Sequence, residues 1–187
     1  MICVFCFYIQ YIFAASGKCA TGELIISDTT SIDDHQYDGC SGFTGPLKLP
    51  TILISIGQYA FRSCSGLTGD LVIPNSVTNI GSNAFEGCTG FTCILHLPDS
   101  LKTIDEYSFS RCSRLTGNLN IPNSVNFLGS NAFEGCTGFN GQLILPDTLA
   151  TIGEFAFYSC NNLAGVLNIP SNLESIGQNA FVNTNFD

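Results

Sequence analysis

The sequence predicts a solenoid in which short parallel strands stack, one from each repeated coil. Three observations support this fold class: a 24-residue unit recurs without a gap, proline and cysteine return in fixed columns, and each unit carries a short stretch of alternating apolar residues. A fixed period of about 20 to 50 residues is the signature of a repeat architecture. In such folds each coil buries its apolar side against its neighbours.

The unit follows the pattern TG-x-L-x-I/L-P-x-x-L/V-x-x-I-G-x-x-A-F-x-x-C-x-x-L/F, and residues 68–91 are its clearest copy. The invariant columns are Pro50, Pro74, Pro98, Pro122, Pro146 and Pro170; Cys40, Cys64, Cys88, Cys112, Cys136 and Cys160; and Phe61, Phe85, Phe109, Phe133, Phe157 and Phe181. A longer period is also present, because residues 73–91 and 121–139 match at 16 of 19 positions. The duplicated unit was therefore a pair of coils, and Asn75 and Asn123 alternate with Asp99 and Asp147.

The x-L-x-I stretch predicts the strand, since apolar residues at every second position indicate a half-buried strand. We expect Leu71 and Ile73 to point inward, with Asp70 and Val72 outward. The following proline ends the strand because it has no N–H to donate. Equivalent strands in consecutive coils would form a parallel sheet with a spacing of about 4.8 Å.

After the proline the apolar spacing changes to about three, which predicts an irregular return or a short helical or 3₁₀ turn on the far side. The phenylalanine column is expected to stack as an aromatic spine, and the cysteine column to form a ladder of buried thiols. The residues given these structural roles are Phe61, Phe85, Phe109, Phe133, Phe157, Cys64, Cys88, Cys112, Cys136 and Cys160.

Three segments are expected. Residues 44–187 form six repeats, of which the last is incomplete, and residues 17–43 form an amino-terminal cap with a degenerate repeat. Residues 1–16 contain an apolar run with the length of a signal-peptide core and are predicted to be a secretory signal. An uncleaved anchor, a cap strand and a misplaced start are the alternatives. At the other end, either Phe186 folds over the last coil or the array continues.

Two cysteines of the mature region lie outside the column. Cys19 is a candidate partner for Cys40, in a disulfide that would staple the cap, and Cys93 is expected to be an exposed thiol in a turn. Stacked column cysteines would be close enough for disulfides by Cα distance. Their side chains point the same way, however, which favours free thiols.

The charge excludes several classes of partner. The net charge is -9, from 15 acidic and 6 basic residues. Nucleic-acid binding depends on Lys and Arg that neutralise phosphates, and anionic membranes attract the same residues. We therefore expect no nucleic acid, and membrane contact only through an uncleaved amino-terminal segment.

The sequence contains no recognisable set of catalytic or metal-binding residues. His35 and His96 are tied to no nucleophile motif, and no phosphate-binding or dinucleotide fingerprint occurs. Asp33, Asp34 and His35 form an acidic loop that is either solvated or a calcium site; the first interpretation is favoured. The sequence thus predicts no enzyme, no cofactor, no metal and no small-molecule substrate.

The strings IPNSVTNIGSNAFEGC, LPDSLKTIDEYSFSRC and LPDTLATIGEFAFYSC resemble the BspA-like leucine-rich repeat family over about residues 44–183. The inserted TG-x before the strand is similar to a variant found in surface proteins of parasitic protists. The resemblance implies a right-handed leucine-rich-repeat solenoid, a secreted or cell-surface location, and adhesion to host or matrix proteins. One copy departs from the pattern, with Cys93, Asp105 and Ser108 in place of Gly, Gly and Ala.

The exposed face of the strands is the candidate binding surface. Its residues are Asp70, Val72, Ile94, His96, Asn118, Asn120, Gln142, Ile144, Val166 and Asn168, preceded by Pro46 and Lys48. These positions vary while the inward columns are constant, and four of the ten are apolar, which favours a contact surface over unconstrained drift. The predicted function is non-catalytic protein binding, such as extracellular or cell-surface adhesion. The alternative is a cytoplasmic scaffold or regulatory interaction module.

Overall fold

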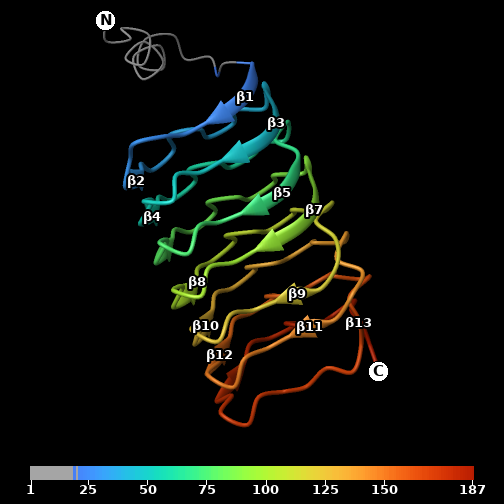
Figure 1. The fold of residues 1–187 in the computed structure, drawn as a ribbon. Coiled ribbons are helices and arrows are strands. Elements are labelled where there is room, and N and C mark those ends of the chain that lie inside the picture. The colour runs from blue at the N-terminus through green and yellow to red at the C-terminus, as the bar shows by residue number, and fades with distance from the viewer. Residues whose placement is uncertain (1–18, 20) are drawn as a thin grey trace, which may run out of the picture.

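A computed structural model describes Cys19 and residues 21–187, and these fold into a stack of similar coils. The coils follow one another from the amino end at the top of Figure 1 to the carboxyl end at the bottom. Every strand pairs in parallel with a strand of a neighbouring coil. The last pair joins Ala164–Gly165 with Asn185–Phe186. The predicted solenoid of stacked coils with parallel strands is confirmed.

The first ladder of strands carries the x-L-x-I stretches. Its members are β1 (Gly22–Ile25), β3 (Phe43–Lys48), β5 (Gly69–Val72), β7 (Phe91–His96), β9 (Leu119–Asn120), β11 (Leu143–Ile144), β13 (Ala164–Gly165) and β15 (Asn185–Phe186). Leu71 lies opposite Leu95, and Leu119 lies opposite Leu143. These leucines are buried, as the period-two pattern predicts.

The ladder is less regular than the sequence indicates. β3 and β7 have six residues, and each pairs with a four-residue strand through a shift in register. In the last full coil the strand, β13, lies at Ala164–Gly165, so that Leu167 and Asn168 are outside any strand. The insert before the alternating stretch therefore changes the pairing from coil to coil, and the repeat pattern alone does not reveal this.

A second ladder was not predicted. It consists of two-residue strands: β2 (Ser31–Ile32), β4 (Ser55–Ile56), β6 (Asn79–Ile80), β8 (Thr103–Ile104), β10 (Phe127–Leu128), β12 (Thr151–Ile152) and β14 (Ser175–Ile176). The isoleucine column is in register, since Ile56 lies opposite both Ile32 and Ile80. The sequence located one strand per coil and did not reveal this second one, because a two-residue strand is too short to show an alternating pattern.

Of the two kinds of return predicted, irregular or short helical, the structure has the irregular one, since the described residues contain no helix. The Ala-Phe segment instead forms a third hydrogen-bonded layer. The Phe61 N–H donates to the Ala84 carbonyl of the next coil at 2.8 Å, while the Arg62 N–H donates back to Tyr59 at 3.2 Å. Alternate N–H groups thus point along the stack and back along the chain. The apolar spacing of these turns in the sequence is similar to that of a 3₁₀ helix. In the structure, however, alternate N–H groups donate to carbonyls of the neighbouring coil.

Glycine permits the close approach of coils just after the second ladder. A Cβ atom placed on Gly129 would lie 2.6 Å from the Glu106 nitrogen of the preceding coil. That separation is far below van der Waals contact, and the obstacle is main chain, which cannot rotate aside. The glycine column therefore follows from the stacking distance.

The phenylalanine column forms the predicted spine. Phe61, Phe85, Phe109, Phe133 and Phe157 are fully buried. Successive rings from Tyr37 to Phe181 stack nearly parallel, with centroids 5.1 to 5.6 Å apart. One aromatic contact thus joins every pair of neighbouring coils.

Both ends of the spine are covered by residues from irregular copies. Tyr37 stacks on Phe61 with centroids 5.2 Å apart, so it occupies the phenylalanine column as expected. Cys19 and Cys40 form the disulfide considered from the sequence, with Cα atoms 5.0 Å apart. At the other end, Phe186 packs edge-on against Phe181 at 6.0 Å. The predicted signal segment, residues 1–16, lies outside the described residues.

Replacing Phe133 with alanine should lower the free energy of unfolding by about 3–5 kcal/mol, because it removes a fully buried ring and its two stacking partners. Urea denaturation followed by circular dichroism would measure the change. The control is Asn120→Ala on the exposed strand face, which should change stability by less than about 0.5 kcal/mol. A loss below about 1 kcal/mol for Phe133→Ala would contradict the central role of the spine.

Candidate protein-binding face

The ten residues proposed from the sequence are all exposed, and they lie on the outer side of the first ladder or just beyond its last members. The aliphatic members are conspicuously open to solvent: Val72 is 50% exposed, Ile94 46%, Ile144 46% and Val166 63%. Since β-strand side chains alternate between faces, the same backbone that buries the leucines presents these residues outward. We call this surface the strand face.

Two of the ten residues have a structural task. The Ile94 N–H donates to Asp70 Oδ1 at 2.9 Å, and the Gln142 N–H donates to Asn118 Oδ1 at 2.9 Å. Each side chain therefore satisfies a main-chain donor of the next coil, where the ladder is irregular. The sequence interpretation treated Asp70 and Asn118 simply as outward groups. Their recurrence 48 residues apart was the available signal that they share a role.

A shallow hollow adjoins the strand face at the carboxyl ends of β5 and β7. Its volume is about 370 Å³, and it is lined by Val72, Ile73, Pro74, Asn75, His96 and Leu97. His96 and Val72 are opposite each other in the ladder. The hollow brings together two of the predicted residues with the proline turn, which the sequence had not connected to the site.

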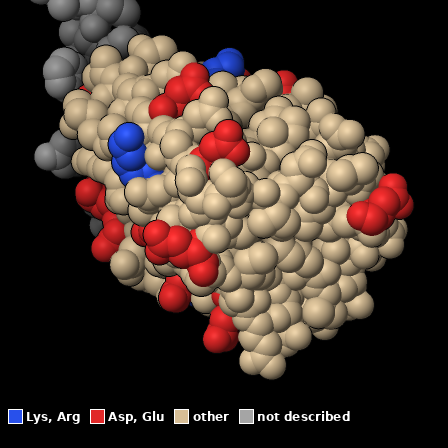
Figure 2. Space-filling view, turned by 90° about the horizontal axis from the view of Figure 1, so that it is seen from below, with Lys and Arg blue, Asp and Glu red and all other residues tan. Residues whose placement is uncertain are grey.

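Charge is sparse on this surface. From Ile94 to Asn168 none of the predicted face residues carries a formal charge with histidine neutral. The end of the stack, seen from below, likewise has scattered acidic groups on a mostly uncharged surface (Figure 2). A partner can thus approach the strand face without strong repulsion or attraction at its centre, and contact there must come from apolar and amide groups.

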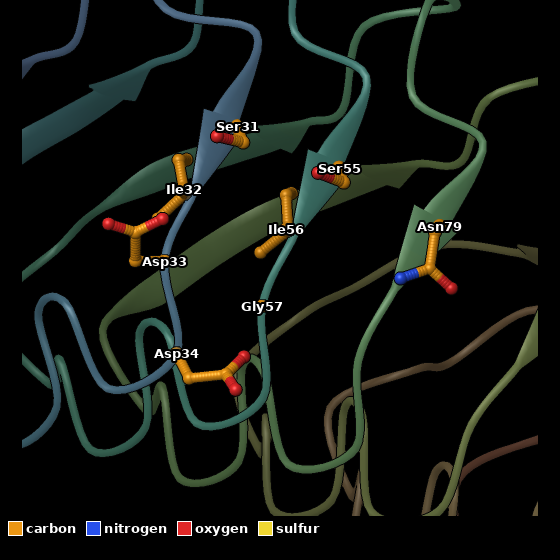
Figure 3. Close-up of a pocket in the computed structure, with 8 residues that line it drawn as sticks. All are labelled: Ser31, Ile32, Asp33, Asp34, Ser55, Ile56, Gly57 and Asn79. Atoms are coloured by element: carbon orange, nitrogen blue, oxygen red, sulfur yellow. The ribbon is translucent and has the colours of Figure 1, made fainter.

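A second hollow, of about 540 Å³, lies over the second ladder near the amino end. Ser31, Ser55 and Asn79 follow one another along its rim, and Asp33 and Asp34 lie below them (Figure 3). The Gln58 N–H donates to Asp34 Oδ1 at 2.7 Å, so this carboxylate is already engaged. Among the residues that the structure describes, no group of His, Cys, Asp and Glu is suited to hold a metal ion.

His35 belongs to a polar cluster on the amino-terminal cap. Arg62 donates two hydrogen bonds of 2.8 Å to Asp38, His35 Nδ1 lies 3.0 Å from Asp38 Oδ2, and the His35 ring stacks on Tyr59 at 4.7 Å. Burial raises the pKa of the Asp38 carboxyl, but hydrogen bonds from Arg62 and His35 outweigh it and hold that pKa below its usual value. The cluster joins two coils, and no nucleophile accompanies His35 within it.

The column thiols are unsuited to nucleophilic chemistry. Cys64, Cys88, Cys112, Cys136 and Cys160 are buried and free. Each Sγ donates to the carbonyl of the aromatic residue one coil earlier, as in Cys112 to Phe85 at 3.1 Å. Burial raises the pKa of the Cys112 thiol to about 12, so that it stays protonated at neutral pH. Cys93 is the exposed free thiol of the described region, at the edge of the strand face.

These features define a leucine-rich-repeat solenoid, a class of fold generally used for protein interaction. The family model described as a BspA type leucine rich repeat region matches residues 30–140 and 92–187, with 6 copies. The chain therefore belongs to the BspA-type leucine-rich repeat family. In the part of the chain described, no helix is long and apolar enough to cross a membrane.

Solved structures of bacterial leucine-rich repeat proteins are similar to the chain. A leucine rich cell surface protein from Faecalibacterium prausnitzii A2-165 matches with a TM-score of 0.74 and 26% identity, over 88% of this chain and 45% of that one. A Bacteroides ovatus leucine-rich repeat protein gives 0.73 and 26%, over 88% and 49%. The T. pallidum leucine rich repeat protein gives a TM-score of 0.76 and 28% identity, over 87% of this chain and 75% of that one.

The chain thus spans about half the length of the first two of these proteins. The search of curated proteins found no match.

The buried thiols predict a loss of stability in alkaline solution. An unfolded cysteine ionises near its ordinary pKa of 9.0, whereas folded Cys112 stays protonated up to about 12. The folded state therefore holds more protons above pH 9. The contribution of each such thiol to the free energy of unfolding is fully present below the pKa of the unfolded cysteine. Above that pKa the free energy of unfolding falls by up to about 1.4 kcal/mol per pH unit for each thiol.

Urea denaturation at several values between about pH 8 and pH 11 would measure this decline. Cys112→Ala should reduce the slope, because it removes one of the buried thiols. A slope that is the same in Cys112→Ala and the unsubstituted protein would contradict the assignment.

Proposed function

We propose that this protein is a non-catalytic binding module that attaches to host or extracellular-matrix proteins through the strand face, as a secreted or cell-surface protein. The observation that carries the proposal is the strand face itself. It presents four exposed branched aliphatic side chains between amide groups, on a scaffold whose inward residues are constant. Exposed apolar groups gathered on one rigid face are typical of a contact surface.

The proposed location draws on two further observations. The similar protein from F. prausnitzii is described as a cell surface protein. The Cys19–Cys40 disulfide favours an oxidising compartment, because cytosolic thiols are normally kept reduced. The five buried thiols agree with either compartment, since their burial protects them from oxidation.

The strand face can be tested with paired charge substitutions. Ile94→Asp with Ile144→Asp should weaken binding to immobilised matrix proteins by about tenfold or more, because two carboxylates would be desolvated in an apolar contact. Binding would be measured by surface plasmon resonance against a panel of purified matrix proteins.

Ile54→Asp is the matched control. Ile54 is 50% exposed and lies beside the second ladder, so its substitution tests the same chemistry elsewhere on the molecule. Equal losses in the control and the double variant would argue against the strand face. Failure of the unsubstituted protein to bind any member of the panel would argue against matrix adhesion.

Location is tested separately by labelling intact cells and determining the mature amino terminus by mass spectrometry. Labelled protein that begins near Gly17 is expected. Unlabelled protein that retains Met1 would contradict secretion and would support the cytoplasmic scaffold instead.

A further inference from the structure

A row of exposed polar residues borders the strand face along the carboxyl ends of its strands. Each residue follows the proline of its coil, and the row reads Asn75, Asp99, Asn123, Asp147. The two aspartates are separated by two coils, which corresponds to about 10 Å at the spacing of parallel strands. Acidic charge therefore recurs along this border with the period of the duplicated coil pair.

Neither aspartate is neutralised within the described part of the chain. The ion pairs there join His35 with Asp38, Lys48 with Glu23, and Arg62 with Asp38, all near the amino end. The neighbouring main chain is held by other groups, such as the Asn172 side chain, which donates to the Asp147 carbonyl at 2.9 Å. Both carboxylates are thus positioned on an ordered turn and remain available to a cation from outside.

The hollow beside Val72, Pro74 and His96 lies at the beginning of the same border, because Asn75 is one of its lining residues. Its walls offer a proline ring, an imidazole and aliphatic carbons. Domains that bind Pro-rich segments receive the proline rings in grooves lined by aromatic side chains. In this hollow the imidazole of His96 is the aromatic group, and Val72, Pro74 and Leu97 supply apolar walls. A ligand that follows the border from this hollow would next meet Asp99.

We propose that this border binds a protein segment in the polyproline II conformation that carries a basic residue at every third position. Such a segment has three residues per turn and a rise of about 3.1 Å per residue, so that its equivalent side chains recur about every 9 Å. This period matches the separation of the two aspartates. An extended β-strand presents equivalent side chains about every 6.8 Å and does not match. The proposal deepens the proposed function, on which it rests, by naming the chemistry of the partner.

The period is tested with synthetic probes. The first is a fluorescent peptide of about five Lys-Pro-Pro repeats, and the second has the same residues with all lysines gathered at one end. Fluorescence anisotropy at low ionic strength is expected to show tighter binding of the first peptide by about fivefold, since only its lysines reach both aspartates together. Equal affinity for the two peptides, or no binding of either, would overturn the proposal.

The site is tested with substitutions that the fold already accommodates. Asp99→Asn with Asp147→Asn introduces the residue found at the same position in Asn75 and Asn123. This variant should lose the preference for the repeated peptide. The control is Glu106→Gln with Glu154→Gln, which removes the same charge from exposed residues of the same two coils, and at a column where Gln58 and Gln178 occur. The control should keep the preference.

An equal loss in both variants would show that only the total charge matters and would overturn the site. If the peptide preference is absent while Ile94→Asp with Ile144→Asp still abolishes matrix binding, this inference fails and the proposed function stands. If neither effect is seen, both fail.

Discussion

The structure depends on in-register hydrogen bonding between coils at one fixed separation. Parallel ladders and the turn layer all connect a residue with its equivalent about one repeat away. Because the second ladder and the leucines of the first ladder pair 24 residues apart, these columns of the sequence become lines of stacked side chains. This explains two of the columns: glycine leaves room for the close approach of coils, as at Gly129, and the ring of Phe133 meets a ring on either side.

The same register explains the chemistry of the interior. A cysteine at each column position places its Sγ beside the carbonyl of the aromatic residue one coil earlier, so its thiol proton has a partner within the core. Burial then keeps the thiols protonated, and the five cysteines act as small apolar residues with one weak donor each. Cys40 is the exception, because its Sγ forms the disulfide with Cys19.

On the surface, stacking converts sequence period into physical spacing. Residues that differ between the two members of a coil pair recur at twice the coil separation, which gives the border of Asp99 and Asp147 its period. Other side chains on the outside are committed to the stack. Asp70 and Asn118 accept main-chain hydrogen bonds of the next coil, so the adaptable part of the strand face consists of residues such as Ile94, Asn120 and Ile144.

The sequence by itself determined the solenoid, the aromatic spine and the outward positions of the strand face. When similar coils stack, equivalent residues take equivalent places, so an apolar column lies inside and a variable polar column lies outside. Tyr37 in the phenylalanine column was likewise readable from the degenerate copy. The tertiary structure decided the second ladder, whose strands of two residues carry no periodic signal, and the non-helical turn layer, whose donors serve a coil 24 residues away. It also decided which outward groups are engaged, since the neighbouring coil offers main-chain donors to Asp70 and Asn118.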